Sequence, residues 1–453
     1  MNATTLVVRC ISFRAVRLCL AAALLGAITQ AQAGISFQVA VATHNEPAAG
    51  SSNVPPDDTL TSQVVLDERS MSVTSGGRAG VFDFASRRRY EIDLKAGTYV
   101  NYSLFDGIGF RVMEVQNRAY LRRALAAAKI ESAMSDPVFD EQALSVASQP
   151  ARSMAEAVDG ADTVLSVDGK PLLRIGAGGA AASAGDAAAF VRYLRYHFGG
   201  HPLVLAKLSG LGRIPSTFVM YYRAVGRSET RTFTISGLTS TAAPAYDLAR
   251  FSERVGGADE IDQLLDSARH AARPAPEAER LRFDAELAAA FAEKRVLDAM
   301  LGAIEWSLMS GAPMVPFSAE RQVMLQADPS VRTVATSMNP SDKAGLNAAV
   351  KAMQSMRAQT MSKRHMLQLF EANHRAKLGE RATALQLFAS VLRANPALAG
   401  AYKDMGDTLF AGFDMPRAWR SWDEGRRIAP ALNLFEAVNQ FEQKLLRDHP
   451  EYF

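Results

Sequence analysis

The stretch YKDMGDTLFAGFDMPRAWRSWDEGRRIAP, residues 402–430, belongs to a pattern that recurs along the chain after 34 residues. The recurring pairs are Ala384 and Ala418, Phe388 and Trp422, and Pro396 and Pro430. A helix-turn-helix unit of this length cannot bury its apolar face alone, so it stacks on neighbouring units and presents a groove. The sequence therefore predicts a helical array near the C-terminus that serves for binding.

The second unit carries the residues that define a known repeat family. Its signature positions hold Tyr402, Met405, Gly406, Leu409, Ala418, Trp422 and Pro430. Over residues 364–448 the chain resembles the tetratricopeptide repeat (TPR) family. Two helices can approach closely only where side chains are small, so Gly406 and Ala418 are expected at the helix contact. Trp422 is expected to fill the space between successive repeats.

The first unit fits this family less well. Its second helix matches through Ala384, Phe388 and Pro396, but its first helix has polar residues at apolar positions of the family, namely Gln368, Glu371 and Arg375. The better core face consists of Leu367, Phe370, His374 and Leu378, which implies an extra residue in the turn at Gly379.

In TPR proteins the first helix of each pair lines the groove. The resemblance places Asn373, Lys377, Lys403 and Asp407 there as candidate partner-binding residues. Their mixed charges do not suit a simple anion clamp, and a solvated surface is the alternative role for each. We expect a protein partner, whose identity the sequence does not reveal.

The N-terminal segment has the pattern of an export signal. Arg9, Arg14 and Arg17 precede the apolar run 18–28, and Ala31-Gln32-Ala33 forms a small-x-small cleavage site. The apolar run is too short to span a bilayer. We expect residues 1–33 to be a signal peptide and the mature protein to be periplasmic, or alternatively secreted, with no membrane span after cleavage.

Cleavage would also change the charge and the cysteine content. The chain has 50 basic and 47 acidic residues, and the signal segment contains three arginines and no acid, so the mature net charge is zero. Such a chain has no electrostatic reason to bind nucleic acid. Both cysteines, Cys10 and Cys19, lie in the removed segment. The mature protein is therefore expected to be free of cysteine, disulfides and Cys-ligated metals.

Residues 34–255 show mainly strand signals. Ile35 to Ala42 reads as a first strand that ends in a loop at Asn45-Glu46-Pro47, and period-two alternation continues from Leu60 to Leu104. Asp168-Gly169 between apolar runs predicts a hairpin. Helices are expected over 118–132 and from Asp186 to Gly199-Gly200. Consecutive strands of this kind predict an α+β domain on an antiparallel sheet with one wet face.

This N-terminal domain resembles the half-barrels of periplasmic lipoprotein carriers in its strand rhythm. The resemblance lies in Val81-Phe82-Asp83-Phe84, in the alternation from Arg89 to Leu94, and in Gly212-Arg213-Ile214-Pro215 ahead of two long strands. In that family a curved sheet wraps an apolar cavity for acyl chains. The resemblance implies a hydrophobic ligand, a lipid or lipoprotein, with plain core as the alternative. The candidate cavity residues are Phe82, Phe84, Tyr90, Ile92, Phe218 and Phe233.

From residue 256 onward the periodicity is helical. Residues 256–362 form a helical middle region, with one long helix or two over 276–309 and another over 342–363, and residues 363–453 contain the repeats. The final segment, 432–447, is expected to be the solvating cap of the array.

Other motifs point to no cofactor, metal or catalytic residue. The run from Leu172 to Ala181 mimics a dinucleotide fingerprint, but a hairpin precedes it and no parallel βαβ unit surrounds it. Four methionines lie close together near His365, at 353, 356, 361 and 366, and are better explained by helix packing than by copper. We therefore expect a binding or scaffold protein of the cell envelope. A hydrophobic-ligand carrier is the alternative, and an enzyme with an unrecognised site is third.

Overall fold

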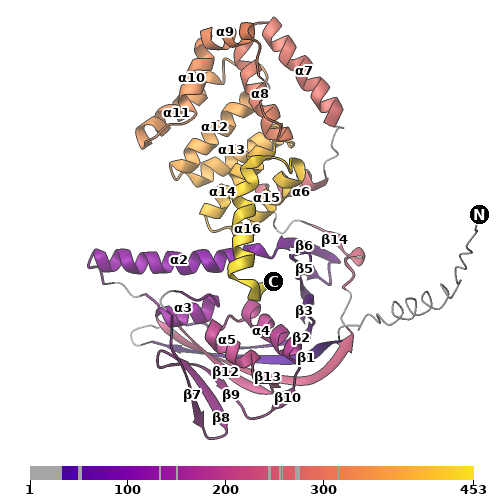
Figure 1. Ribbon diagram of the computed structural model, residues 1–453, viewed down its shortest axis with the longest axis vertical. Helices are drawn as coiled ribbons and strands as arrows, with labels where there is room; N and C mark the ends of the chain where they lie inside the picture. Colours follow the sequence, from indigo (N-terminus) through magenta and orange to yellow (C-terminus); the bar gives the residue numbers. More distant parts are fainter. Residues whose placement is uncertain are drawn as a thin grey trace, which may run out of the picture.

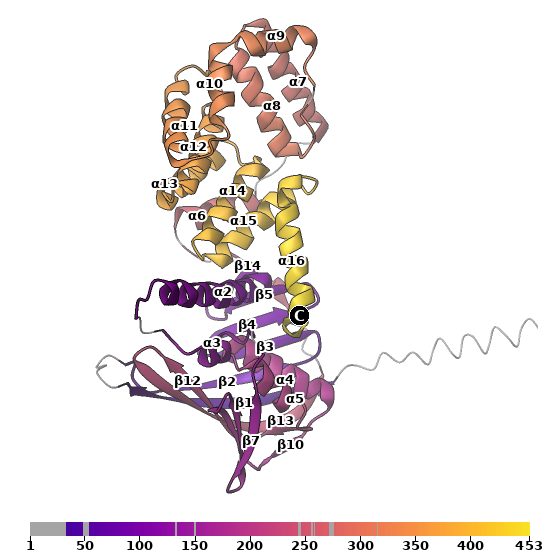
Figure 2. The ribbon, with the colours of Figure 1, turned by 60° about the vertical axis from the view of Figure 1, so that its left-hand side comes forward.

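The computed structural model describes residues 33–48, 54–131, 134–148, 151–242, 246–254, 257, 259–270, 276–314 and 316–453. The expected signal peptide, including Cys10 and Cys19, lies outside these residues, apart from Ala33 at its end. The fold is α+β: a large N-terminal sheet is followed by a helical C-terminal part (Figures 1 and 2).

The main sheet has twelve strands in the order β14-β6-β5-β4-β3-β2-β1-β13-β12-β9-β8-β7. Its neighbours pair antiparallel, with the exception of β14 beside β6. A second, two-stranded sheet joins β10 and β11. The strands are β1 (Ala33–Pro47), β2 (Asp58–Leu66), β3 (Ser70–Ser75), β4 (Arg78–Asp83), β5 (Arg88–Asp93), β6 (Thr98–Ser103), β7 (Met154–Asp159), β8 (Asp162–Val167), β9 (Lys170–Ile175), β10 (Gly179–Ala181), β11 (Arg213–Pro215), β12 (Thr217–Ala224), β13 (Arg227–Ala242) and β14 (Ser252–Glu253).

The long central strand β1 shows why one face of the sheet is buried. Its alternate residues Ile35, Phe37, Val39 and Val41 are all buried, because side chains two apart point to the same face. That face packs against α4 (Ala184–His197) and α5 (Pro202–Ser209), around which the sheet curves (Figure 2). Fully burying one aromatic or aliphatic side chain stabilises the fold by about 1.5–3 kcal/mol, so this face forms the core of the domain.

Local turn chemistry explains the confirmed hairpin. Asp168 and Gly169 have φ values of 48° and 75°, the left-handed pair that a two-residue turn between β8 and β9 requires. The predicted loop at Asn45–Pro47 is wrong, because β1 continues there. Its last residues pair with Arg227 to Glu229 of the β12–β13 hairpin, which extends the sheet beyond the apolar run.

The helices of the N-terminal part differ from the predicted ones in their starts. Helix α2 (Phe105–Ala127) begins well before residue 118. Its first turns are not predicted from the sequence because Gly107 and Gly109 have low helix propensity. Helix α3 (Pro137–Leu144), capped by Asp136, is an additional helix that the sequence pattern does not indicate. The cap of α4 is Ser183, whose hydroxyl accepts a hydrogen bond from the Asp186 N–H, so Asp186 is not the cap itself.

Eleven helices follow in the described C-terminal part. They are α6 (Glu260–His270), α7 (Pro276–Ala292), α8 (Val296–Ser310), α9 (Ala319–Ala327), α10 (Pro329–Ser337), α11 (Lys343–Met356), α12 (Arg364–Lys377), α13 (Arg381–Ala394), α14 (Ala399–Ala411), α15 (Met415–Ile428) and α16 (Glu436–Asp448). The 276–309 stretch is thus two helices, and the helix expected over 342–363 ends at Met356. Helices α12 and α13 pack on each other, as do α14 and α15.

The close contact in the second pair depends on a missing side chain. A Cβ added at Gly406 would lie 2.4 Å from the Trp422 ring and 3.1 Å from the Ala418 carbonyl oxygen. Trp422 therefore packs within its own pair, where its ring N–H donates to the Lys403 carbonyl at 3.2 Å. The extra residue predicted for the turn at Gly379 is not found. Three residues separate α12 from α13, the same number that separates α14 from α15.

The helical part is docked on the sheet domain through α15. Trp419 of α15 is fully buried against Gly109 of α2, where an added Cβ would lie 2.5 Å from the Trp419 Cη2 atom. Beside this contact Arg88 of β5 pairs with Asp423 of α15 at 2.7 Å. One face of the α14–α15 pair is therefore occupied by the protein's own N-terminal domain.

Helix α16 and the residues after it connect the helical part to the sheet domain. Helix α16 runs from the array down to the sheet domain, where the C-terminus ends (Figure 1). Tyr452 is fully buried there, and its hydroxyl lies 3.1 Å from the Ser145 carbonyl oxygen. The Tyr196 hydroxyl donates in turn to the Tyr452 carbonyl at 2.8 Å. Beyond the segment 432–447 that is expected to cap the array, the chain therefore continues to a contact with the N-terminal domain at Tyr452.

Candidate functional site

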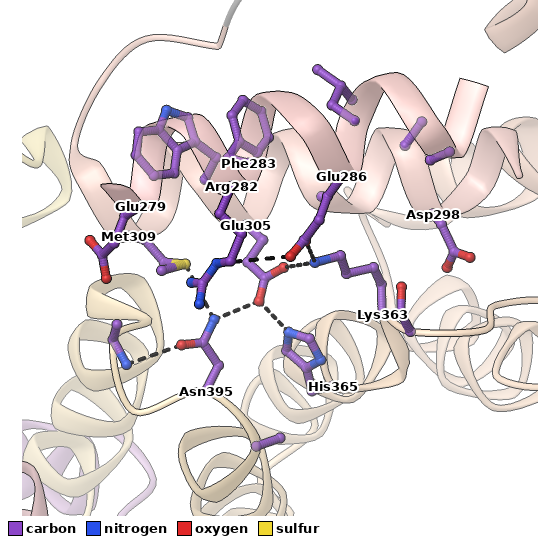
Figure 3. A pocket seen from close by; sticks show the side chains of 18 of the residues that line it. Glu279, Arg282, Phe283, Glu286, Asp298, Glu305, Met309, Lys363, His365 and Asn395 are labelled. Carbon is purple, nitrogen blue, oxygen red and sulfur yellow. Dashed lines mark hydrogen bonds and ion pairs between the residues drawn. The ribbon is translucent and has the colours of Figure 1, made fainter. Parts of the chain in front are cut away.

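A cavity of about 850 Å³ lies between α7, α8 and the turns that lead into α12 and α14 (Figure 3). We call it the cradle cavity. The end of α15 closes it on one side through Arg427 and Ile428, and Ala268 of α6 also reaches it. A cavity of this size falls in the range of small-molecule and side-chain binding sites.

Aromatic and aliphatic side chains form one wall of the cradle cavity. Phe283 of α7 and Trp306 of α8 stack with their ring centroids 5.0 Å apart and their planes nearly parallel. Leu287, Met309 and Ile428 extend this apolar wall. The stack holds α7 against α8 and offers a flat, rigid surface to an apolar group.

The polar centre of the cavity is Glu305, a buried carboxylate on α8. Its Oε2 atom lies 2.7 Å from the Lys363 Nζ atom, and its Oε1 atom lies 2.5 Å from the Nε2 atom of His365 and 2.5 Å from the Nδ2 atom of Asn395. These residues converge on Glu305 in Figure 3. Because Lys363 and His365 lie at the start of α12 and Asn395 caps the end of α13, one carboxylate fastens α8 to both helices of the α12–α13 pair.

The electrostatics of this cluster follow from its contacts. Burial alone would raise the pKa of Glu305, but the hydrogen bond from His365 and the positive charge of Lys363 outweigh it and lower the pKa to about 2. Burial would likewise lower the pKa of Lys363, and the Glu305 carboxylate raises it. At neutral pH the cluster is therefore a fixed, hydrogen-bonded ion pair.

A second carboxylate shapes the segment between α11 and α12. Asp298 of α8 accepts hydrogen bonds from the Thr360 hydroxyl and, at 3.2 Å, from the Met361 N–H. Arg295 lies 3.3 Å from the same carboxylate. The Thr360 hydroxyl oxygen also accepts from the Lys363 N–H at 2.9 Å, so Lys363 is directed toward Glu305.

Charges of both signs line the remainder of the cavity. Glu279 and Glu286 of α7 are seven residues apart, which is two turns and therefore the same helix face, and Glu293 follows directly after the helix ends at Ala292. The Glu286 carboxylate lies 3.3 Å from the Lys363 Nζ atom, and Glu293 pairs with Arg295 at 2.7 Å. Arg282 of α7 also lies 3.8 Å from Glu286, so on this side of the cavity Glu286 and Glu293 are paired with basic side chains.

The four groove residues expected from the TPR resemblance lie outside the cradle cavity, on α12 and α14. Asn373 donates to Asp404 at 2.7 Å, and Lys403 pairs with Asp407 at 2.6 Å. Asp407 also accepts from the Trp422 ring N–H at 3.1 Å, and the charge of Lys377 acts on Asp404. The structure therefore joins the four residues around Asp404, which the sequence did not single out.

Asp404 is the unusual group of this second cluster. Burial raises the pKa of its carboxyl group to about 6, and the hydrogen bond from Asn373 offsets only part of this rise. The nearby Asp407 carboxylate raises the pKa further. The face of α12 and α14 therefore carries an acid that titrates just below neutrality.

The six aromatic and aliphatic candidates of the sheet domain divide between its two faces. Phe82, Phe84, Phe218 and Phe233 are buried in the core that includes α4, and the rings of Phe218 and Phe233 stack 4.4 Å apart. Tyr90 and Ile92 lie in a separate small cluster with Ala79 and Val81. None of the six is among the lining residues of the three cavities found within the described residues.

Sequence reasoning did not find the cradle cavity, although it left one signal. Glu305 stands between Ile304 and Trp306 in a strongly apolar helix, where an isolated carboxylate needs a partner. Its partners are 58 to 90 residues away in the chain. The methionine tract has no common site: Met353 and Met366 are fully buried, whereas Met361 is 77% exposed.

Within the described ranges, no group of three or more His, Cys, Asp or Glu side chains is arranged to hold a metal ion. In the same ranges no helix combines the length and apolar character needed to cross a bilayer. Comparison of the sequence with models of protein families and with curated proteins found no match.

Proposed function

We propose that this is a protein-binding protein of TPR type, exported to the cell envelope, and that the cradle cavity receives a segment of its partner. The observation that supports this most directly is the cavity itself: about 850 Å³ of space with a stacked aromatic wall, bounded by the turns of the helical array. Apolar pockets with a few placed polar groups are the usual form of a binding site.

The cavity chemistry favours binding over catalysis. A general acid working near pH 7 needs a pKa close to 7, whereas the pKa of Glu305 is lowered to about 2. Its carboxylate already has Lys363, His365 and Asn395 as partners. Glu305 therefore serves as a fixed structural centre that holds the walls of the site in place.

The charges of the wall indicate what kind of segment fits. The carboxylates on this side of the cavity, Glu279 and Glu286 of α7 and Glu293 just beyond its end, complement a segment that carries lysine or arginine. The Phe283 and Trp306 stack complements an apolar anchor residue on the same segment. We expect a partner sequence in which apolar and basic residues alternate over a few positions.

Filling the cavity tests this function. Gly302 of α8 lines the cavity, and a Cβ added there would have its nearest neighbour at 3.4 Å, so Gly302→Leu can extend into the space without a backbone clash. The control is Gly107→Leu on α2, where an added Cβ meets nothing within 4 Å. Both changes replace a helical glycine, so the two variants differ mainly in the cavity.

The measurement is affinity purification from a native envelope extract, followed by direct binding of the purified partner. Gly302→Leu is expected to lose the partner, and Gly107→Leu is expected to retain it with unchanged affinity. If both variants bind equally well, the cradle cavity is not the binding site. If the protein yields no specific protein partner at all, the proposed function itself fails.

A further inference from the structure

A second large cavity, of about 590 Å³, lies in the N-terminal domain between α2, α3 and the β12–β13 hairpin. We call it the basic cavity. It shares no lining residue with the cradle cavity, and the proposed protein-binding function does not use it.

Arginine dominates the lining of the basic cavity. Five arginines face it, against two carboxylates; the arginines are Arg111, Arg118, Arg223, Arg227 and Arg231, and the acids are Asp140 and Glu229. Such a surplus of like charge around one open cavity raises the local concentration of anions.

The two carboxylates are already committed to neighbouring side chains. Asp140 accepts from Arg118 and from the Ser135 hydroxyl, both at 2.5 Å, and it also pairs with Arg122 from outside the lining. Glu229 pairs with Arg231 at 2.5 Å and with Arg227 at 3.5 Å. Their charge therefore does not neutralise the rest of the cavity.

Two arginines remain without a carboxylate partner among the described residues. Arg111 donates to two backbone carbonyl oxygens, those of Leu144 at 3.1 Å and Tyr196 at 2.9 Å. Arg223 lies over the Phe139 ring, with its guanidinium carbon 5.5 Å from the ring centroid. Arg223 therefore presents a charged group whose hydrogen-bonding capacity is open to a ligand.

Aromatic rings hold these cations in place. Arg231 lies over the Tyr222 ring at 4.7 Å, and the Tyr222 hydroxyl is fixed by donating to the Phe198 carbonyl at 2.8 Å. Stacking on a ring fixes the plane of a guanidinium, and the plane of Arg231 is also held by the hydrogen bond that its Nε atom donates to Glu229 at 2.5 Å. Pre-organisation of this kind lowers the entropy lost when an anion binds.

His197 lines the cavity as an exposed residue and adds no further positive charge at neutral pH. Desolvation by the surrounding protein atoms lowers the pKa of its imidazole to about 4, and the charge of Arg111 acts in the same direction. The charge of the site at pH 7 is therefore set by its arginines and does not change between pH 6 and pH 8.

We infer that the basic cavity is a binding site for a phosphate group, with Arg223 as the principal ligand and Arg227 beside it. A phosphate carries up to two negative charges and accepts from more than one guanidinium, which matches the surplus of arginine better than a single carboxylate does. The remaining volume, bounded by Phe139, Phe198 and Tyr222, accommodates an apolar or planar group attached to the phosphate.

The test uses the full-length mature protein and two probes. Inorganic pyrophosphate is titrated calorimetrically, and sedimentation is measured with phosphatidylglycerol vesicles against phosphatidylcholine vesicles. Binding of pyrophosphate identifies a soluble phosphate compound as the source, and selective sedimentation with phosphatidylglycerol alone identifies a lipid headgroup. Acetate at equal concentration is expected to bind more weakly than pyrophosphate.

Matched variants locate the site. Arg223→Gln and Arg227→Gln are expected to weaken binding of the responding probe about ten- to hundredfold, as loss of a charge-assisted hydrogen bond does. Arg69→Gln, an exposed arginine in the turn between β2 and β3, is expected to leave it unchanged. Thermal unfolding confirms that each variant folds. The inference is overturned if neither probe binds at millimolar concentration, or if Arg223→Gln binds as tightly as Arg69→Gln.

Discussion

The docking of the helical array on α2 can be tested with a single methyl group. Gly107 and Gly109 lie two residues apart on the same helix, yet an alanine at each would meet different surroundings. A Cβ at Gly107 has no neighbour within 4 Å, whereas a Cβ at Gly109 would lie 2.5 Å from the Trp419 Cη2 atom and 3.1 Å from its Cζ3 atom. Real Cβ atoms do not approach other atoms this closely, so Trp419 or α2 must move.

The Trp419 ring has little freedom to move. It is fully buried, its Nε1 atom donates to Glu442 at 2.9 Å, and it contacts the rings of Phe410 and Trp422. Overpacking of a rigid core site costs about 1–3 kcal/mol. Replacing a helical glycine by alanine contributes up to about 1 kcal/mol of stability, and both variants share this gain. The two free energies of unfolding should therefore differ by about 1–3 kcal/mol.

The measurement is urea denaturation followed by tryptophan fluorescence, with the two alanine variants and the wild type compared under identical conditions. Gly107→Ala is expected to match or slightly exceed the wild type, and Gly109→Ala is expected to unfold at lower urea concentration, with an early change in the fluorescence of the array. Equal stability of the two alanine variants would refute the packing of Trp419 on α2, and with it the docked arrangement of the two parts.

The remaining predictions concern the cradle cavity, the groove and the C-terminus. Because the pKa of Glu305 falls from its ordinary 4.5 to about 2 on folding, its ionised form stabilises the protein by up to about 3 kcal/mol above pH 4.5. This stability is lost as the pH falls toward 2, and Glu305→Gln should flatten the acid limb of a stability–pH profile. A profile of Glu305→Gln that still matches the wild type would show that the cluster is not formed. Folding raises the pKa of Asp404 to about 6, so its effect on stability has the opposite sign: the wild type gains stability as the pH falls below 6. Asp404→Asn should therefore be more stable than the wild type at pH 8, and the two proteins should be equally stable below pH 4. Thermal scans at both pH values measure this, and a constant difference would contradict the buried acid. Tyr452→Ala should reduce the free energy that holds the C-terminus on the N-terminal domain by about 3–5 kcal/mol. The chain around α16 should then be cleaved by protease. Tyr452→Phe, which keeps the ring but loses the hydroxyl contact with Ser145, should be cleaved much more slowly than Tyr452→Ala, and equal cleavage rates would argue against packing as the cause.

The predicted elements were most accurate where a pattern is local. The alternation along β1, the left-handed pair Asp168-Gly169 and the small residue Gly406 each have a direct structural consequence within a few residues or one helix pair. The start of α2 was missed for the opposite reason. Gly109 is unfavourable for a helix by itself, and its presence is explained only by Trp419, which lies 310 residues later in the chain.

The two cavities could not be predicted from spacing along the chain. Glu305 meets Lys363, His365 and Asn395 only because α8 lies across the turns that begin α12 and α14. The arginines of the basic cavity come from α2 and from the β12–β13 hairpin, which are separated by about a hundred residues. These arginines form a single charged site only because the fold places them around one cavity.

By itself the sequence determined the α+β class, the antiparallel sheet with one buried face and the helical C-terminal part, because hydrophobic periodicity is set by backbone geometry over a few residues. Tertiary structure alone decided that α15 and Tyr452 fasten the array to the sheet domain. It also decided which polar residues meet in a buried site. These contacts depend on the mutual placement of whole elements, because a buried charge is stable only where distant segments bring its partners to it.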